Sequence, residues 1–317
     1  MSENNTSGWE RTVLEKVALA AVTEQRRARR WGIFFKLLIF GYFLVVLFIA
    51  MGWMGKRDGF PAKHTALVEL NGVIGPGTAA SADAIMQGLA DAFKDKRTQG
   101  IVLRINSPGG SPVQAGYIND EIKRLRAKYP EIPLYAVVED VCASGGYYVA
   151  VAADKIFVNK ASMIGSIGVL MNGFGFTGAM EKLGVERRLL AAGENKGFLD
   201  PFSPLNEEQR GHAKQMLAEI HEQFIDVVRK GRGKRLKETP EMFSGLIWVG
   251  QKSVELGLAD ALGSAEQVAR DVIKAEELVD FTPRENVAER LAKRFGTSMA
   301  ESLVKLGAGG VINLQLR

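Results

Sequence analysis

Two glycine-rich turns that follow apolar segments hold the residues best suited to chemistry. The first reads Asn-Ser-Pro-Gly-Gly over residues 106–110, and the second reads Ala-Ser-Gly-Gly over residues 143–146. A serine at a helix start lies beside unpaired N–H groups and the positive end of the helix dipole. The glycines that follow it let a substrate backbone approach closely. The pattern therefore suits Ser144 as a nucleophile with an oxyanion site next to it.

Ser144 also has a commoner structural interpretation, in which it only caps the helix expected over residues 144–153. Other glycine motifs do not fit either turn. Neither turn fits the GxGxxG that a dinucleotide fold places after its first strand, and the chain has no GxxxxGK[ST] phosphate loop. The GxSxG elbow of α/β-hydrolases fails because Cys142 stands two residues before the serine.

A serine nucleophile needs a general base, and the candidates in this sequence are histidines and lysines. The three histidines are poorly placed: His64 lies close to the apolar N-terminal segment, and His212 and His221 fall on roughly opposite faces of one predicted helix. A neutral lysine is the alternative, because burial lowers the pKa of a lysine from about 10.4 by several units. Local pattern does not choose among the lysines that follow the serine, which are Lys155, Lys160, Lys182 and Lys196.

Strand-like and helix-like segments alternate from residue 65 onward. The pattern predicts strands at residues 66–74, 101–105, 134–138 and 155–158, and helices at residues 81–94, 111–125 and 144–153. Ser111 and Pro112 are typical of a helix start, and Asn206 with Gln209 forms a capping-box pattern for a later helix. Such alternation predicts an α/β fold with parallel strands and right-handed crossovers.

Residues 32–54 predict a single membrane anchor. They carry one charge, Lys36, and as a helix they would extend about 35 Å, enough to cross a bilayer core of about 30 Å. Trp31 and Trp53 stand at the ends, where indoles prefer the lipid interface. A cleaved signal peptide is disfavoured, because 31 residues precede the run. Four arginines within residues 26–30 place the N-terminal tail in the cytoplasm.

Composition excludes several classes of protein. The chain has 317 residues, one cysteine, three histidines and a net charge of +5. One cysteine excludes an intrachain disulfide and any multi-cysteine metal site, and the modest charge gives no indication of a nucleic-acid partner. We therefore expect no metal and no cofactor. We divide the chain into a cytoplasmic tail (1–31), the anchor (32–54), a globular domain (62–275) and a C-terminal tail (276–317).

Several stretches, in the same order along the chain, carry a resemblance to a known family. They are RINSPGG (104–110), ASGGYY (143–148), AADKIF (152–157), IGSIGV (164–169) and KGRG (230–233). In these stretches the chain resembles the signal peptide peptidase A (protease IV) family of bacterial membrane-anchored serine peptidases, in its short form. The resemblance implies a Clp-protease/crotonase-like α/β fold, with a repeated ββα core and a parallel sheet behind one transmembrane helix.

The same resemblance implies the catalytic residues. Ser144 would be the nucleophile and Lys196 the base of a Ser/Lys dyad, and Ser166 would orient the lysine. Gly110 matches the family's oxyanion donor, and Gly145 is a second donor by analogy with Clp-type sites.

The implied function is a serine endopeptidase that degrades cleaved signal peptides and other hydrophobic peptides through an acyl-enzyme. It would sit in the bacterial inner membrane with a periplasmic catalytic domain and form a homo-oligomer. A crotonase-like acyl-CoA enzyme and a non-catalytic membrane scaffold are the alternatives. Cys142 departs from the family pattern and is a candidate modification site.

Overall fold

The computed structural model describes residues 6–50 and 63–284. The chain divides into two units, of which one contains the N-terminal helix and the other spans residues 60–285.

The first unit contains helix α1 (Thr6–Ala50), which is 45 residues long. It is long and apolar enough to cross a membrane, with a mean hydropathy of 2.2 over its most apolar window and no part of that window buried. Residues 32–50 of the predicted anchor are helical, whereas residues 51–54 lie outside the described residues. Residues 6–31, which belong to the predicted cytoplasmic tail, continue the same helix, and their location in the cytoplasm stays a prediction.

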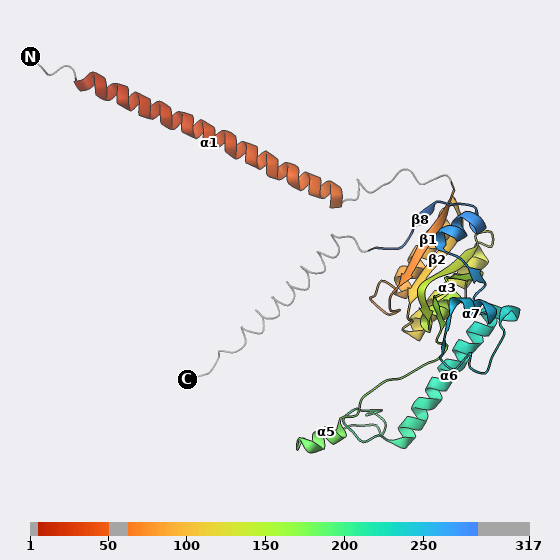
Figure 1. Cartoon of the computed structure of the whole chain (residues 1–317). Coiled ribbons are helices and arrows are strands. Elements are labelled where there is room, and N and C mark those ends of the chain that lie inside the picture. Colours follow the sequence, from red (N-terminus) through yellow and green to blue (C-terminus); the bar gives the residue numbers. More distant parts are fainter. Residues whose placement is uncertain (1–5, 51–62, 285–317) are drawn as a thin grey trace, which may run out of the picture. The chain divides into compact units, whose positions relative to one another are not determined.

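The second unit is built on an eight-stranded sheet (Figure 1). Its strands are β1 (His64–Asn71), β2 (Thr98–Ser107), β3 (Leu134–Ala143), β4 (Lys155–Val158), β5 (Met163–Gly165), β6 (Ile247–Val249), β7 (Ala261–Leu262) and β8 (Leu278–Asp280). The order is β6-β5-β3-β2-β1-β8, and β4 joins β3 to β7 beside this path. Only the β5–β6 pair is antiparallel among the described strands. The predicted α/β class is therefore confirmed.

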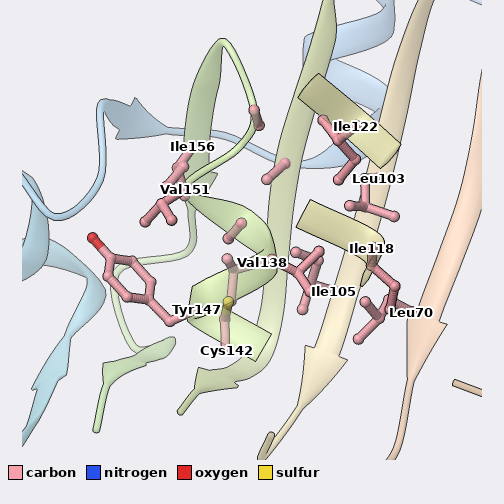
Figure 2. Close-up of a cluster of buried hydrophobic side chains, with 14 of the residues drawn as sticks. Leu70, Leu103, Ile105, Ile118, Ile122, Val138, Cys142, Tyr147, Val151 and Ile156 are labelled. Carbon is pink, nitrogen blue, oxygen red and sulfur yellow. The ribbon is translucent and has the colours of Figure 1, made fainter. Parts of the chain in front are cut away.

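Helices cover both faces of the sheet. Helices α2 (Ala82–Lys94), α3 (Pro112–Lys128) and α4 (Gly145–Ala150) share the larger apolar core with inward residues of the strands. Figure 2 shows part of this core, in which Ile118 and Ile122 of α3 lie beside Leu70, Leu103 and Ile105. A smaller cluster on the opposite face joins strand residues to α8 (Ala265–Gln267) and the helical turn η2 (Val268–Ile273).

Local signals place most boundaries within a few residues. The Ser111 hydroxyl accepts the N–H of Gln114 with Pro112 in the first turn, as predicted. Helix α4 is shorter than the predicted 144–153. Strand β8 lies in the stretch predicted as a C-terminal tail, and it pairs with β1, so the sheet extends beyond residue 275. Residues from 285 onward lie outside the described residues.

Helix α6 (Glu207–Arg232) connects the sheet to a long segment that we call the arm, residues 170–206 with the short helix α5 (Thr177–Lys182). The C-terminal half of α6 is fastened to the core by buried side chains, including Phe224 and Val228. Figure 1 shows α5 beyond the N-terminal end of α6. The chain continues through η1 (Gly233–Arg235) and α7 (Gly250–Glu255) back to the sheet.

The KGRG stretch forms the joint between α6 and the sheet domain. The Arg232 side chain is 1% exposed and donates to Asp260 at 2.8 Å and to the carbonyl of Gly257 at 2.8 Å. A β-carbon at Gly231 would collide with the carbonyl oxygen of Val151, so only glycine fits there. The stretch therefore has a structural role.

Candidate active site

Ser144 occupies a strained turn between β3 and α4. Its backbone has φ 51° and ψ −123°, a region that residues with a β-carbon rarely adopt. It is the N-cap residue of α4, but its side chain makes no capping hydrogen bond. The interpretation of Ser144 as only a helix cap is therefore wrong. Strain of this kind holds the nucleophile in other strand-to-helix turns.

Backbone bonds hold this turn in place. The Ser144 N–H donates to the carbonyl of Gly165 at 2.8 Å, and the Ser144 carbonyl accepts from Tyr148 at 3.0 Å. The Ser144 side chain is half-buried, and its hydroxyl makes no hydrogen bond with the described residues. The hydroxyl is thus free to give its proton to a base.

The first glycine turn packs directly against the serine turn. A β-carbon added at Gly109 would lie 2.7 Å from the Gly145 nitrogen, and one added at Gly145 would lie 3.3 Å from the Gly110 nitrogen. Within residues 63–284, neither the amide of Gly110 nor that of Gly145 has an acceptor. Two amides without acceptors flank the nucleophile, which is the arrangement that an oxyanion requires.

Ser107 supports this arrangement, and sequence reasoning missed it. Its buried hydroxyl accepts the N–H of Gly109 at 3.1 Å and donates to the carbonyl of Gly72 at 2.6 Å. The Gly109 carbonyl in turn accepts from Ile74 at 2.8 Å. The available signal was a serine directly before Pro-Gly, since serine hydroxyls commonly bond the backbone two residues ahead in turns.

Ser166 lies beside the same turn. It follows β5 with φ 50°, and its N–H donates to the carbonyl of Leu246 at 2.8 Å. The preceding residue, Gly165, is the one that accepts the Ser144 N–H. The structure therefore brings together four predicted site residues: Ser144, Gly110, Gly145 and Ser166.

Lys196 does not join them within one chain. It is exposed in the arm, where the adjacent Asn195 accepts a hydrogen bond from Gln209 of α6 at 3.2 Å. The other end of α6 reaches the site domain, where Phe224 packs on Tyr148 at 5.2 Å between ring centroids. Gln209 and Phe224 are fifteen residues apart on one helix, or about 22 Å. This separation is much longer than a lysine side chain.

The contact of Gln209 with the arm also corrects one prediction. Asn206 caps α6 as expected, since its side chain accepts from Glu208 and Gln209. Gln209 does not complete a capping box, because its side-chain amide bonds Asn195 and the N–H of Leu199 instead.

Among the histidines, His221 comes nearest to the site. Its Nε2 lies 3.1 Å from the carbonyl oxygen of Ile167, the residue after Ser166. No hydrogen bond joins His221 to Ser144 in the described chain. His212 makes an edge-to-face contact with Phe198 in the arm, and His64 lies at the start of β1.

Cys142 is not a candidate for modification. Its side chain is fully buried in the core shown in Figure 2, and burial raises the pKa of its thiol. Elsewhere in residues 6–50 and 63–284, no group of three or more His, Cys, Asp or Glu residues lies together in a way that could hold a metal ion.

The globular domain is similar in sequence to known proteins. The family model of peptidase family S49 matches residues 126–279. The protein "Putative protease slr0021" of Synechocystis sp. is 31% identical over 204 residues, which cover 64% of this chain and 71% of that protein. The chain belongs to peptidase family S49. The family and the Clp-protease-like fold are those that the resemblance to signal peptide peptidase A predicted.

Other relatives match this chain over only part of their own length. "Putative signal peptide peptidase SppA" of Enterococcus faecium is 33% identical over 60% of this chain and 54% of that protein. "Na(+)/H(+) antiporter NhaA" of Brucella melitensis is 45% identical over 55% of this chain and 24% of that protein. The chain thus spans between a quarter and about half of the length of these relatives. The S49 match includes Ser144, Ser166 and Lys196, whereas Gly110 precedes it.

Proposed function

We propose that this S49 peptidase is a membrane-anchored endopeptidase whose Ser144 works with Lys196 of a neighbouring copy. The observation that carries the proposal is the Ser144 hydroxyl on a strained turn between the amides of Gly110 and Gly145, since none of these three groups has a hydrogen-bond partner among the residues that the structure describes. In this proposal one chain supplies the nucleophile and both oxyanion donors. The predicted base is about one helix length away from it.

The proposed reaction begins when the uncharged Nζ of Lys196 takes the Ser144 proton and Oγ bonds to the peptide carbonyl carbon. The carbonyl oxygen becomes an oxyanion and accepts hydrogen bonds from Gly110 and Gly145. The lysine then gives its proton to the leaving amine as the peptide C–N bond breaks. Water attacks the resulting ester with Nζ as base, and the proton returns to Ser144.

The surface of the arm supports contact with a second copy. It carries large apolar side chains in water, among them Leu170 (82% exposed), Phe174 (75%), Leu183 (78%) and Leu190 (96%). Monomeric proteins rarely expose so many together, and such patches mark interfaces. Docking the arm on a neighbour would also bury Lys196, and burial favours the uncharged amine that a base requires.

A closed homo-oligomer follows from this arrangement. If each arm reaches the next serine turn, the contact is head-to-tail, and we propose that the rotation between copies closes the contacts into a ring instead of an open filament. Ser166 then lies where it can hydrogen-bond the incoming amine and orient it.

The proposed substrates are hydrophobic peptides, including signal-peptide remnants, at the bacterial inner membrane. Helix α1 supports an anchor, and the similar Enterococcus protein is named a signal peptide peptidase. An anchor holds the enzyme beside such peptides and so raises their effective concentration. The arginine-rich flank of α1 would face the cytoplasm, with the peptidase domain in the periplasm.

Mixing two inactive variants of the full chain tests the shared dyad. Ser144→Ala and Lys196→Ala should each fail to cleave a fluorogenic apolar peptide. Co-assembled at equal amounts in detergent, they should recover about a quarter of wild-type activity, because a working site then needs one particular pair of neighbours. A dyad within one chain would recover nothing. The matched control is His221→Gln, which should retain activity, and its inactivity would make the histidine the base.

A further inference from the structure

Four arginines of α1 form a dense cationic cluster. Arg26, Arg27, Arg29 and Arg30 fall within five residues and are all exposed. None of them forms an ion pair with an acidic side chain of the described residues. The proposed peptidase reaction makes no use of them.

The helix brings these charges into contact with one another. Residues three and four apart are neighbours on a helix surface, so Arg26 lies beside both Arg29 and Arg30, and Arg27 lies beside Arg30. Like charges at these spacings destabilise a helix. An anion held between the side chains removes the repulsion. Guanidinium groups bind phosphate oxygens in pairs and so suit this role better than lysines do.

The cluster is followed at once by the apolar part of α1. Trp31 comes next, and its ring lies 5.8 Å from those of Phe34 and Phe35. Indole rings prefer the headgroup level of a bilayer. If α1 spans the membrane, the guanidinium groups therefore lie at the height of the lipid phosphates.

We infer that these four arginines form a binding site for the phosphate groups of anionic phospholipids. This inference rests on the membrane anchor of the proposed function, but not on the peptidase reaction. Orientation in the membrane needs positive charge alone. The use of arginine alone and the helical spacing of the four residues add a selective site for anionic lipid, which would surround the anchor with such lipid at one face of the membrane.

Native mass spectrometry of the full chain in mild detergent tests the site. The chain is incubated with equal amounts of phosphatidylglycerol and phosphatidylcholine, and the bound lipids are counted. Wild type should retain phosphatidylglycerol over phosphatidylcholine by about fivefold or more. Replacing all four arginines with glutamine should bring the ratio close to one. An undiminished ratio in that variant, or no preference in wild type, would overturn the inference.

A single-residue comparison separates the site from general attraction between charges. Arg30→Gln should lower the lipid ratio, whereas Lys16→Gln should not, because Lys16 is an exposed cation of the same helix about 15 Å before Arg26. Equal losses in both variants would refute a defined site. Resistance of the wild-type chain to extraction from membranes by carbonate reports the anchor independently. Loss of the chain to carbonate would therefore count against the anchor, and an unselective lipid ratio against the arginine site.

Discussion

Gly109 lies against the side chain of Ser144 so closely that a β-carbon at Gly109 would stand 2.7 Å from the β-carbon of the serine. Gly109 also has φ 101°, which favours glycine. The serine turn and the first glycine turn are thus in direct contact, and a substitution in either should change the geometry of both.

Gly109→Ala should therefore reduce peptidase activity sharply. A loss of aligned oxyanion donors costs about 100-fold in kcat. Steady-state cleavage of an apolar peptide measures the effect. Gly116→Ala is the matched control, since nothing lies near Gly116 in α3 and alanine is the better helix former. That variant should keep its activity, and equal losses in both would refute a special role for the Gly109 contact.

Ser107→Ala should lower kcat while leaving the chain folded. It removes the acceptor of the Gly109 N–H, so the oxyanion turn loses its support. We expect roughly a tenfold loss of kcat and about 1 kcal/mol of stability. Ser253 is an equally buried serine that donates to the carbonyl of Gly250. Ser253→Ala should lower the stability by a similar amount and leave kcat unchanged. An equal fall in kcat in both variants would mean that Ser107 has no special role in supporting the oxyanion turn.

The buried pair of Arg232 and Asp260 should make stability depend on acid. Burial works to raise the pKa of the Asp260 carboxyl, but the hydrogen bond and charge of Arg232 outweigh it, so the pKa lies below 3.8. A carboxyl with a lowered pKa stabilises the fold above its unfolded value of about 3.9, and this is lost as pH falls through the folded value. Urea unfolding should show this acid loss in wild type, and Asp260→Asn should flatten it. An unchanged pH profile in the variant would contradict the assignment.

Removing one partner of that pair should be severe. Arg232→Ala removes the buried partner of the part-buried Asp260 carboxylate, which then keeps only the more exposed Arg235 at 3.1 Å, and should cost about 3 kcal/mol. Arg229 lies one turn before Arg232 in α6 and forms an exposed ion pair with Glu238. Arg229→Ala breaks this pair and should cost about 1 kcal/mol or less. Urea melts of both variants compare the two values, and similar costs would mean that Arg232 is not the joint of α6.

Leu190→Ser should separate the copies without unfolding them. Leu190 is 96% exposed in the arm, so its replacement removes little from the core of its own chain. Light scattering should show a smaller assembly, and activity should fall with it while the Tm stays unchanged. The control is Val272→Ser, because Val272 is an exposed apolar residue outside the arm. This variant should keep the size of the assembly and its activity. An intact and active Leu190→Ser assembly would argue against the arm as an interface.

Cys142 should resist thiol reagents in the native protein. Its thiol is fully buried and burial raises its pKa, so little thiolate forms near neutral pH. Maleimide should label it only after unfolding in urea, as mass spectrometry would detect. Rapid labelling of the folded chain would show that the core opens around β3.

The sequence by itself determined the features that depend on neighbouring residues. The glycines of both turns, the caps at Ser111 and Asn206 and the strand–helix alternation all act within a few positions. They could therefore be predicted from the spacing and the types of the residues. The motif that carries Ser144 belongs to this class, because a strained turn is built from the residues within it.

Only the tertiary structure decided how far apart the predicted catalytic residues lie. Lys196 follows Ser144 by 52 residues, and this spacing is equally compatible with contact and with separation. The length of α6 and the bonds of Gln209 to the arm hold the lysine away from its own serine. The role of Ser107 toward Gly72 and the Arg232–Asp260 pair likewise join distant positions. Such contacts depend on how helices and strands pack together, and a local sequence pattern does not predict this packing.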